Sequence, residues 1–384
     1  MNLRTLFNLY ICVAIYYLLC GCTSERKGLG FTLIDVNASY WEKEIKLEDI
    51  VNIEYLQIGV YEDFLFSESP SIITSDKIIF GTLDGGFLVF SRDGKPLSKF
   101  NHRGGGPGEY PVTTGGPIYD AAADELYVKT HGKIMVYSSS GEFRRVLSLP
   151  KEASMQRIVN YDSATLLLYD EQELFSAPFS FISKEDGNVV ETVNIPIGEK
   201  LNLKVPVMMG DSFTVFFQPS IGNIVKYKDG YLLADSSNDT IYYFSPYKKL
   251  LPTIVRKPKI HLMNPIITLS CIIEAGNYEF MYTEKVVQVK FEDRRLPRIY
   301  LMRDKQTGSV YKQKIVLNDY KGKEVNLSHE TIMRTQDSKL GLVVLGLTEL
   351  QEANRDNKLS GRLKELVDNS DEDGNDIFML LHFK

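Results

Sequence analysis

A turn that closes on glycine recurs along the chain, and this repeat restricts the fold more than any other feature of the sequence. Each copy follows an aromatic or β-branched run, and the four turns end at Gly94, Gly141, Gly187 and Gly308. The first three glycines are spaced by about 46 residues, a period typical of repeat architectures. Glycine at the end of such a turn takes the left-handed position of a hairpin bulge. The repeat therefore predicts a series of similar antiparallel sheets.

Further strands extend this repeat to six units. A fifth copy at residues 241–248 lacks the glycine. Each of the five copies is preceded by a short strand, and these strands lie at residues 77–80, 126–128, 166–169, 231–234 and 278–282. A sixth unit would combine residues 340–347 with 376–384, and residues 52–58 would supply its outer strand. Abundant Tyr, Phe, Ile, Val and Thr favour strands. We predict an all-β, six-bladed β-propeller that both ends of the chain close; the repeat period argues against a β-sandwich or a two-domain β protein.

One segment near the C-terminus departs from the strand pattern. Residues 348–368 are rich in Glu, Lys, Arg and Leu, and Leu350, Ala353 and Leu363 follow a near-helical spacing that Gly361 interrupts. We predict one or two short helices inserted into the last blade. Such helices are more often a cover packed on the rim of the ring than a docking element for a partner.

Residues 100–110 read Phe-Asn-His-Arg-Gly-Gly-Gly-Pro-Gly-Glu-Tyr and cannot form a helix or a regular strand. Three consecutive glycines allow positive φ and close backbone approach, and proline removes a donor. We expect a crossing from the outer strand of one blade to the inner strand of the next, with its side chains near the mouth of the central channel. The candidate site residues are His102, Arg103, Gly104, Gly105, Gly106, Pro107, Gly108, Glu109 and Tyr110.

A structural role for this crossing is the alternative, and we favour it. Glu109 would then accept hydrogen bonds from loop backbone donors, and Arg103 would pair with a neighbouring carboxylate. A phosphate site is a weak interpretation, because no Gly-Lys-Ser/Thr follows and the next element is a strand rather than a helix.

The same stretch carries a family resemblance. The pattern Phe-x-x-x-Gly-Gly-Gly-Pro-Gly-Glu-Tyr-Pro, followed by Ile-x-Val-Tyr-x-x-x-Gly-Glu-Phe, resembles an NHL-type propeller repeat. Residues 106–110 and their context are more similar still to the six-bladed β-propeller lipoproteins of Bacteroidetes. The resemblance covers residues 47–384. The resemblance implies a propeller architecture and a location in the cell envelope. By analogy it also implies a role associated with nutrient uptake at the envelope, but it implies no reaction.

The N-terminal residues are typical of an export signal. Arg4 precedes an apolar run at residues 6–20, which is short for a bilayer span. The run ends in Leu19-Cys20-Gly21-Cys22, which resembles a bacterial lipobox with Cys22 as the acylated residue. We expect a signal peptide at 1–21, a tether at 22–46 and the propeller at 47–384. A lipid anchor would hold the protein at the cell envelope, in the outer membrane by expectation; an uncleaved membrane anchor is the alternative.

Composition narrows the classes of function. The net charge is −6 with Lys and Arg scattered, so we expect no nucleic-acid partner. Cys271 is the one cysteine outside the export segment and is expected to be a small buried residue. The five histidines form no HxH or HExxH pair, so we predict neither a metal nor a cofactor, and no catalytic residue is assigned.

The resulting functional prediction is a binding or scaffolding module. A ring of loops around a channel mouth suits a glycan, a peptide or a partner protein. The alternative is a propeller enzyme: a glycan hydrolase or lyase, or a metal-dependent lactonase-like or amidating-lyase-like enzyme. Three or more His, Asp or Glu side chains gathered on the axis would favour the enzyme.

Overall fold

A computed structural model gives the structure of the protein and describes residues 30–66, 69–149, 157–171, 177–210 and 213–384. The chain divides into two units, Met1–Thr32 and Leu33–Lys384. The features below belong to the second unit. The export segment at 1–21 and Cys22 lie outside the described residues.

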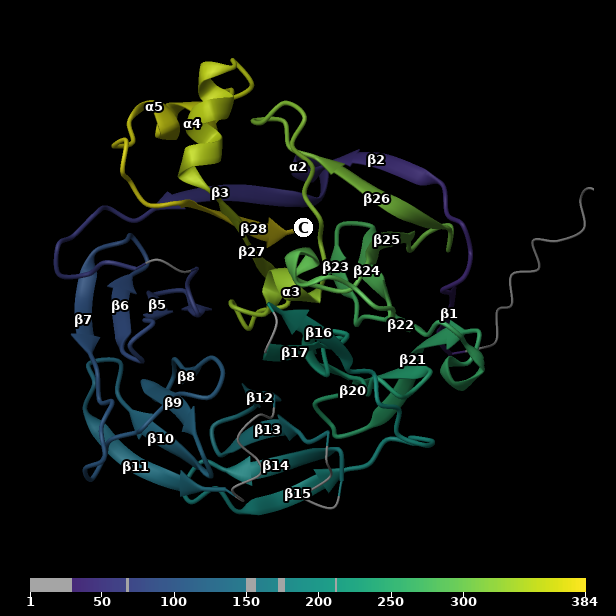
Figure 1. Ribbon diagram of the computed structural model, residues 1–384, viewed down its shortest axis with the longest axis horizontal. Coiled ribbons are helices and arrows are strands. Elements are labelled where there is room, and N and C mark those ends of the chain that lie inside the picture. Colours follow the sequence, from purple (N-terminus) through teal and green to yellow (C-terminus); the bar gives the residue numbers. More distant parts are fainter. Residues whose placement is uncertain (1–29, 67–68, 150–156, 172–176, 211–212) are drawn as a thin grey trace, which may run out of the picture. The chain divides into compact units, whose positions relative to one another are not determined.

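Six antiparallel sheets form the blades of a β-propeller, as predicted (Figure 1). The first blade contains β4 (Ile72–Ile73), β5 (Lys77–Gly81), β6 (Phe87–Ser91) and β7 (Pro96–Phe100). The second contains β8 (Ile118–Asp120), β9 (Glu125–Thr130), β10 (Lys133–Tyr137) and β11 (Phe143–Ser148). The third contains β12 (Arg157–Asn160), β13 (Thr165–Tyr169), β14 (Phe179–Ser183) and β15 (Val189–Val193). In each of these blades the strands follow one another in chain order, from the inside of the ring to its edge.

The four strands of the fourth blade keep this order, whereas the fifth and sixth blades depart from it. The fourth contains β18 (Ile224–Tyr227), β19 (Gly230–Leu233), β20 (Thr240–Phe244) and β21 (Leu250–Lys257). The fifth contains β22 (Ile267–Leu269), β23 (Ile273–Ala275), β24 (Tyr278–Lys285), β25 (Arg298–Asp304) and β26 (Val310–Val316). The sixth contains β27 (Leu340–Leu345), β28 (Ile377–Phe383) and β3 (Val51–Gln57). The last blade therefore joins strands from opposite ends of the chain.

The glycine-closed turns adopt the predicted conformation. Gly94, Gly141 and Gly187 all have positive φ, between 82° and 91°, and each of the three hairpins shows a register shift at the turn. In the fourth blade Lys248 takes this position with φ 58°, and its N–H donates to Ser245 O at 2.9 Å. The fourth blade therefore keeps the turn conformation although lysine replaces glycine at this position.

The core lies between neighbouring blades. Strands of a propeller are covered on both faces, and alternate residues of one strand contribute to two different clusters. In β14, Phe179 and Phe181 pack toward the fourth blade, whereas Ile182 packs toward the second. Cys271 is fully buried in the cluster shared by blades four to six. Shared clusters between successive blades make the ring one cooperative core.

Both ends of the chain close the ring, as predicted. β28 pairs with β27 on one side and with β3 on the other. All its residues from Ile377 to Leu381 are buried; Met379 packs toward the fifth blade and Phe378 toward the first. Arg92 of the first blade also pairs with Glu54 of β3 at 2.9 Å.

Two additional strands occur in the part of the chain that we expected to be a tether. β1 (Thr32–Asp35) adds to the edge of the fourth blade, and β2 (Glu42–Lys46) pairs in parallel with β26 of the fifth. A short helix, α2 (Leu47–Ile50), then leads into β3. The chain between residues 33 and 46 is therefore part of the propeller, and its alternating Glu and Lys in β2 are those of an exposed edge strand.

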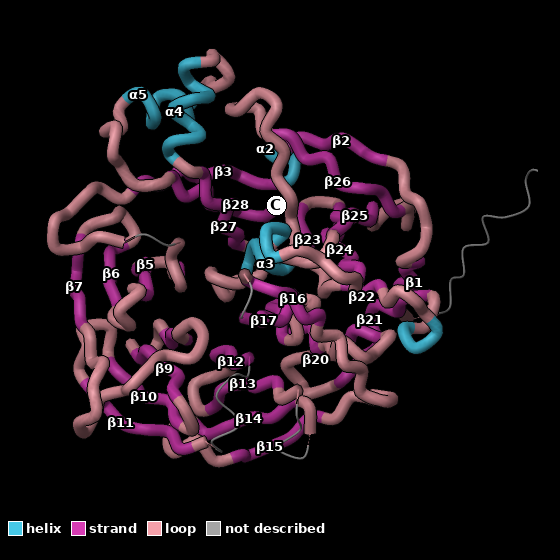
Figure 2. Tube along the Cα trace, in the orientation of Figure 1, coloured by secondary structure: helices cyan, strands magenta, loops and turns pink. Residues whose placement is uncertain are grey.

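The helices are few and short (Figure 2). α4 (Leu347–Arg355) and α5 (Gly361–Asp368) are inserted between β27 and β28, as predicted, and pack through Leu350 and Leu363. α3 (His329–Ile332) lies toward the middle of the ring. Two 3-10 turns are η2 (Ile260–Leu262) and η3 (Phe291–Asp293). Among the described residues, no helix has the length and apolar character needed to cross a bilayer.

A separate hairpin is inserted in the sequence between the third and fourth blades. Its strands are β16 (Val205–Met209) and β17 (Phe213–Phe217). Val205 and Val207 pack against Leu296, which follows η3, whereas Met208 and Phe216 are exposed. This insertion explains why the repeat spacing lengthens after Gly187.

Candidate functional site

The glycine-rich crossing connects β7 to β8, as the sequence predicted. The carboxylate of Glu109 accepts a hydrogen bond from the Gly106 N–H at 2.7 Å. A Cβ at Gly104 would lie 2.7 Å from the Glu109 Cδ, so a side chain there would displace this carboxylate. The expectation of positive φ within the triple glycine is wrong for residues 104–106; Gly108 instead has φ 77°. Pro107 and Gly108 make the bend that brings Glu109 back over the loop.

The other side chains of this crossing make contacts within it. His102 donates from Nε2 to Gly141 O at 2.7 Å and stacks on Tyr137 with ring centroids 4.9 Å apart. The Arg103 Nε–H donates to Pro111 O at 3.3 Å, a carbonyl rather than the expected carboxylate. The buried Tyr110 donates to Gly85 O at 2.7 Å. A ligand-binding role for residues 102–110 stays a prediction.

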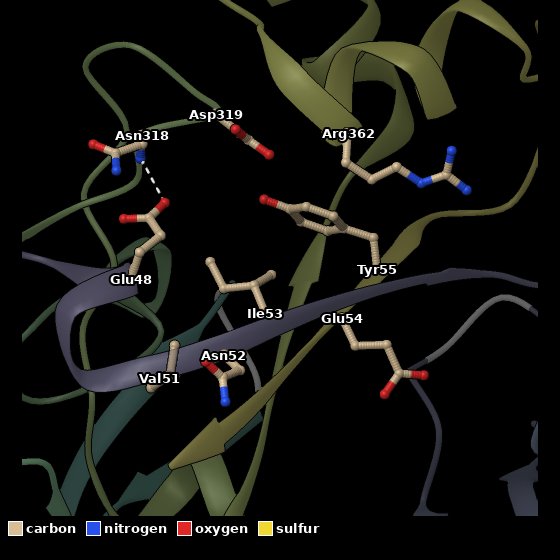
Figure 3. A pocket seen from close by; sticks show the side chains of 9 residues that line it. All are labelled: Glu48, Val51, Asn52, Ile53, Glu54, Tyr55, Asn318, Asp319 and Arg362. Atoms are coloured by element: carbon tan, nitrogen blue, oxygen red, sulfur yellow. Dashed lines mark hydrogen bonds between the residues drawn. The ribbon is translucent and has the colours of Figure 1, made fainter. Parts of the chain in front are cut away.

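A first pocket opens beside the closing strand β3 (Figure 3). It measures about 640 Å³, and its lining residues are Glu48, Val51, Asn52, Ile53, Glu54, Tyr55, Asn318, Asp319 and Arg362. Glu48 already accepts a hydrogen bond from the Asn318 N–H at 2.9 Å. Burial, together with Asp319 and Glu48, raises the pKa of Tyr55 above its ordinary value. The pocket belongs to the outer edge of the sixth blade, where these contacts join β3 to the 318–319 loop.

A second pocket lies at the inner strands of the blades and measures about 690 Å³. Its lining comes from β8, β9 and β12, from the segments that precede β4, β8 and β18, and from the segment around α3. Its lining residues are Ser69, Ser71, Gly115, Gly116, Pro117, Ile118, Lys129, Arg157, Ile158, Val159, Ser220, Glu330, Met333, Arg334 and Gln336. We call this pocket the channel pocket, because innermost strands converge on the axis of a propeller. Gly115 and Gly116 come from the same crossing as the glycine run, whereas residues 102–110 do not line the pocket.

Basic side chains gather in the channel pocket. Lys129 comes from β9, Arg157 from the start of β12 and Arg334 from the segment after α3. Burial and the neighbouring charge of Arg157 lower the pKa of Lys129 to about 8. Arg334 donates to Ser69 O at 3.1 Å, which fixes the segment after α3 to the first blade. Two cations from separate blades and a third from the segment after α3 thus line one cavity.

The acidic residue of the channel pocket is held by an arginine. Glu330 lies in α3, where the hydroxyl of Ser328 caps the helix by accepting the Glu330 N–H at 3.3 Å. Its carboxylate receives two hydrogen bonds from Arg298, at 2.7 and 2.9 Å. Arg298 also pairs with Glu284 at 2.7 Å. This buried network keeps Glu330 ionised and leaves it little capacity to neutralise the other cations of the pocket.

A smaller hollow continues from the channel pocket past Arg157. Asn160, Lys226, Tyr231 and His329 line it together with Arg157. His329 is fully buried, and neither ring nitrogen has a hydrogen-bond partner among the described residues. Burial, together with the cations Arg157 and Arg298, lowers the pKa of His329 to about 3, so this ring is neutral at physiological pH.

The described part of the chain contains no assembled metal site. No three His, Cys, Asp or Glu side chains there are grouped so that they could hold a metal ion. What the channel pocket offers instead is hydroxyl groups, backbone glycines and basic side chains around a cavity of small-molecule size. The arrangement is suited to recognition of a small polar ligand.

The sequence matches one family over nearly its whole length. The profile of the family described as a domain of unknown function, DUF4934, matches residues 31–382. The chain belongs to the DUF4934 family. The match starts just before β1 and ends within β28, so the DUF4934 domain includes the two N-terminal edge strands as well as all six blades. No match was found among curated proteins.

Solved structures of Bacteroides proteins align with this DUF4934 protein over most of its length. A presumed exported protein from Bacteroides fragilis NCTC 9343 aligns with a TM-score of 0.60 and 13% sequence identity. The alignment covers 92% of this chain and 99% of that protein. A member of the DUF4221 family from Bacteroides vulgatus ATCC 8482 aligns over 88% of this chain and 98% of its own, with 10% identity and a TM-score of 0.47. At 13% identity, the first likeness shows a common fold and carries no activity with it.

Proposed function

We propose that this protein is an exported, lipid-anchored propeller of the cell envelope that binds a small ligand in its channel pocket. The observation that carries the proposal is the convergence of the inner strands β8 and β12, the segments that precede β4 and β18, and the α3 segment on one cavity of about 690 Å³. Cavities of this size hold small molecules, and polar groups placed on rigid strands orient such ligands. The pocket is open to solvent, so a ligand can enter without unfolding the ring.

The proposed location at the cell envelope is supported by the N-terminal sequence and by a structural relative, and not by the pocket. The lipobox-like Leu19-Cys20-Gly21-Cys22 supports acylation at Cys22, and the Bacteroides fragilis protein that shares the fold is itself a presumed exported protein. The NHL-like and lipoprotein resemblance points the same way. A glycan, a peptide or a partner protein remains a ligand class that such a propeller can serve.

Filling the channel pocket tests the proposal. Gly116 lines the pocket and lies outside the left-handed region, and a Cβ added to it would have no other atom within 4 Å. Gly116→Phe therefore places a ring in the cavity without a backbone clash. Gly105→Phe is the matched control, because Gly105 is equally open but lies in the glycine run away from the pocket.

Binding is measured by isothermal titration calorimetry with a panel of neutral sugars, sugar acids and tripeptides. We expect at least one compound of the panel to bind the wild-type protein and the Gly105→Phe variant alike, and Gly116→Phe to lose that binding. Retained binding in Gly116→Phe together with lost binding in Gly105→Phe would move the site to the glycine run and overturn the proposal.

A further inference from the structure

We propose that the channel pocket binds its ligand through a carboxylate that pairs with the guanidinium of Arg157, and that the ligand is a monosaccharide-sized sugar acid. The inference rests on the proposed function, since it names the ligand class of the same pocket. Arg157 lines both the channel pocket and the smaller hollow behind it. It is therefore placed where a ligand entering the channel would meet it.

Arg157 differs from the other buried or half-buried arginines of the blades. Arg145 forms two hydrogen bonds with Glu125, at 2.6 and 2.7 Å, and Arg303 pairs with Glu279 at 2.7 Å. Arg298 is shared between two carboxylates. For the guanidinium of Arg157, the described part of the chain provides neither a hydrogen bond nor an ion pair, although the residue is partly buried at the start of β12.

Burial of a cation that has no partner among the described residues has an energetic consequence. Burial lowers the pKa of Arg157, because a charged group withdrawn from water is destabilised until an opposite charge compensates it. Its field also lowers the pKa values of Lys129 and His329. An anion placed beside Arg157 would offset the field of this cation and its repulsion with Lys129, so the folded pocket favours an anionic ligand.

The groups around Arg157 indicate the chemical nature of the rest of the ligand, to which the anionic group is attached. A planar guanidinium offers two parallel N–H donors, and this fork matches a carboxylate. Ser69, Ser71 and Ser220 line the same pocket, and Gly116 leaves open space beside exposed backbone. Serine hydroxyls and backbone groups suit the hydroxyls of a sugar. A uronic acid combines both features in one molecule of suitable size.

Titration calorimetry of the purified protein with matched sugars tests the inference. The ligands are D-galacturonate and D-glucuronate, their neutral counterparts D-galactose and D-glucose, and inorganic phosphate and sulfate. The variants are Arg157→Gln, which removes the charge, and Arg157→Lys, which keeps it without the fork. Arg362→Gln is the control, since Arg362 lines the pocket beside β3 and pairs with Glu365 on the exposed face of α5.

We expect a uronate to bind the wild-type protein at least tenfold more tightly than its neutral counterpart. Arg157→Gln should lower uronate affinity at least tenfold, Arg157→Lys should be intermediate, and Arg362→Gln should be unchanged, with all variants keeping the wild-type circular dichroism spectrum. A tenfold loss of affinity corresponds to the loss of about one charge-assisted contact.

Three results would overturn the inference. Equal binding of uronates and neutral sugars that Gly116→Phe abolishes would refute the carboxylate while leaving the channel site intact. Binding of phosphate or sulfate alone would refute the sugar acid as the ligand. Failure of all six compounds to bind, with a tripeptide still bound in a manner sensitive to Gly116→Phe, would refute the sugar acid without refuting the proposed function.

Discussion

Glu109 explains why one glycine of the crossing tolerates no side chain while its neighbour does. The carboxylate of Glu109 occupies the space above Gly104, whereas Gly105 faces open space. Three glycines in a row predicted a loop. They did not indicate which glycine must lack a side chain, because that depends on where the side chain of Glu109, five residues after Gly104, packs. The carboxylate contact, and not backbone conformation, sets the requirement at Gly104.

Alanine substitutions separate these two glycines. Gly104→Ala should lower the free energy of unfolding by about 1 kcal/mol, because Glu109 must give up its hydrogen bond to the Gly106 N–H. Gly105→Ala should change it by less than about 0.5 kcal/mol. In a Glu109→Ala background the cost of Gly104→Ala should largely disappear, as measured by urea denaturation. Equal costs at both glycines would contradict this explanation.

Acid sensitivity is also set at the level of single residues. Two hydrogen bonds from Arg145 lower the pKa of Glu125 from 4.5 to about 2, against the opposing effect of burial. Since the unfolded state binds the proton more readily, this stabilisation is complete above about pH 4.5 and is lost as the pH falls toward 2. The contribution is about 2–3 kcal/mol.

Glu125→Gln tests this assignment. The variant should lose stability at pH 7 and show a smaller decrease of unfolding free energy between pH 5 and pH 3 than the wild-type protein, because it no longer takes up a proton on unfolding. Chemical denaturation across this pH range gives both quantities. A pH dependence identical to that of the wild-type protein would show that other carboxylates control acid unfolding.

At the scale of elements, a strand could be predicted from the sequence when neighbouring strands and blades bury it, and not when it is an exposed edge. β28 is apolar on both faces because it lies between two strands and two neighbouring blades, so its role in closure could be read from residues 377–381. β2 could not be recognised, because its sequence Glu-Lys-Glu-Ile-Lys is that of an exposed edge and contains one apolar residue. The helices α4 and α5 were recognisable from a period that strands do not have.

Closure by β28 makes the C-terminal strand necessary for the ring. Phe378 is 1% exposed and its ring lies 5.9 Å from that of Phe80 in the first blade. Phe378→Ala should destabilise the protein by about 3–5 kcal/mol, and His382→Ala, at an exposed position of the same strand, by less than about 1 kcal/mol. Thermal denaturation measures both.

Deletion of residues 377–384 is the stronger form of this test. The deletion removes five buried side chains and exposes the edges of β27 and β3. We expect aggregation, since the loss is comparable with the whole net stability of a domain, about 5–15 kcal/mol. A soluble, monomeric and cooperatively folded truncated protein would contradict closure by both ends.

For the whole molecule, the architecture was predictable and the channel pocket was not. The blade repeat is a local pattern with a constant period, so it is visible in one sequence. Lys129 and Arg157 lie in separate blades, Arg334 follows α3, and the three share no motif or spacing; only the closed ring brings them to one cavity. The one local sign of the pocket in the sequence is a charged residue, Arg157, at the first position of an inner strand. Charged residues at strand ends are too common to identify a site.

The proposed membrane attachment concerns the whole molecule and would depend on Cys22, which lies outside the described part of the chain. Cys22→Ala should abolish acylation and move the protein from the membrane fraction to the soluble fraction, because anchoring by lipid depends on burial of the acyl chains. Metabolic labelling with a fatty acid, followed by fractionation, measures both effects; Cys20→Ala is the control. Unchanged labelling of Cys22→Ala would exclude Cys22 as the acylated residue.

The central claim is that the channel pocket is where this propeller holds its ligand. A crystal structure of the protein grown with a saturating concentration of D-galacturonate tests it most directly. We predict density for the sugar between Ser71, Gly116 and Arg157, with its carboxylate paired to the guanidinium of Arg157. Density at the glycine run or beside β3, with the channel pocket holding solvent alone, would contradict the claim.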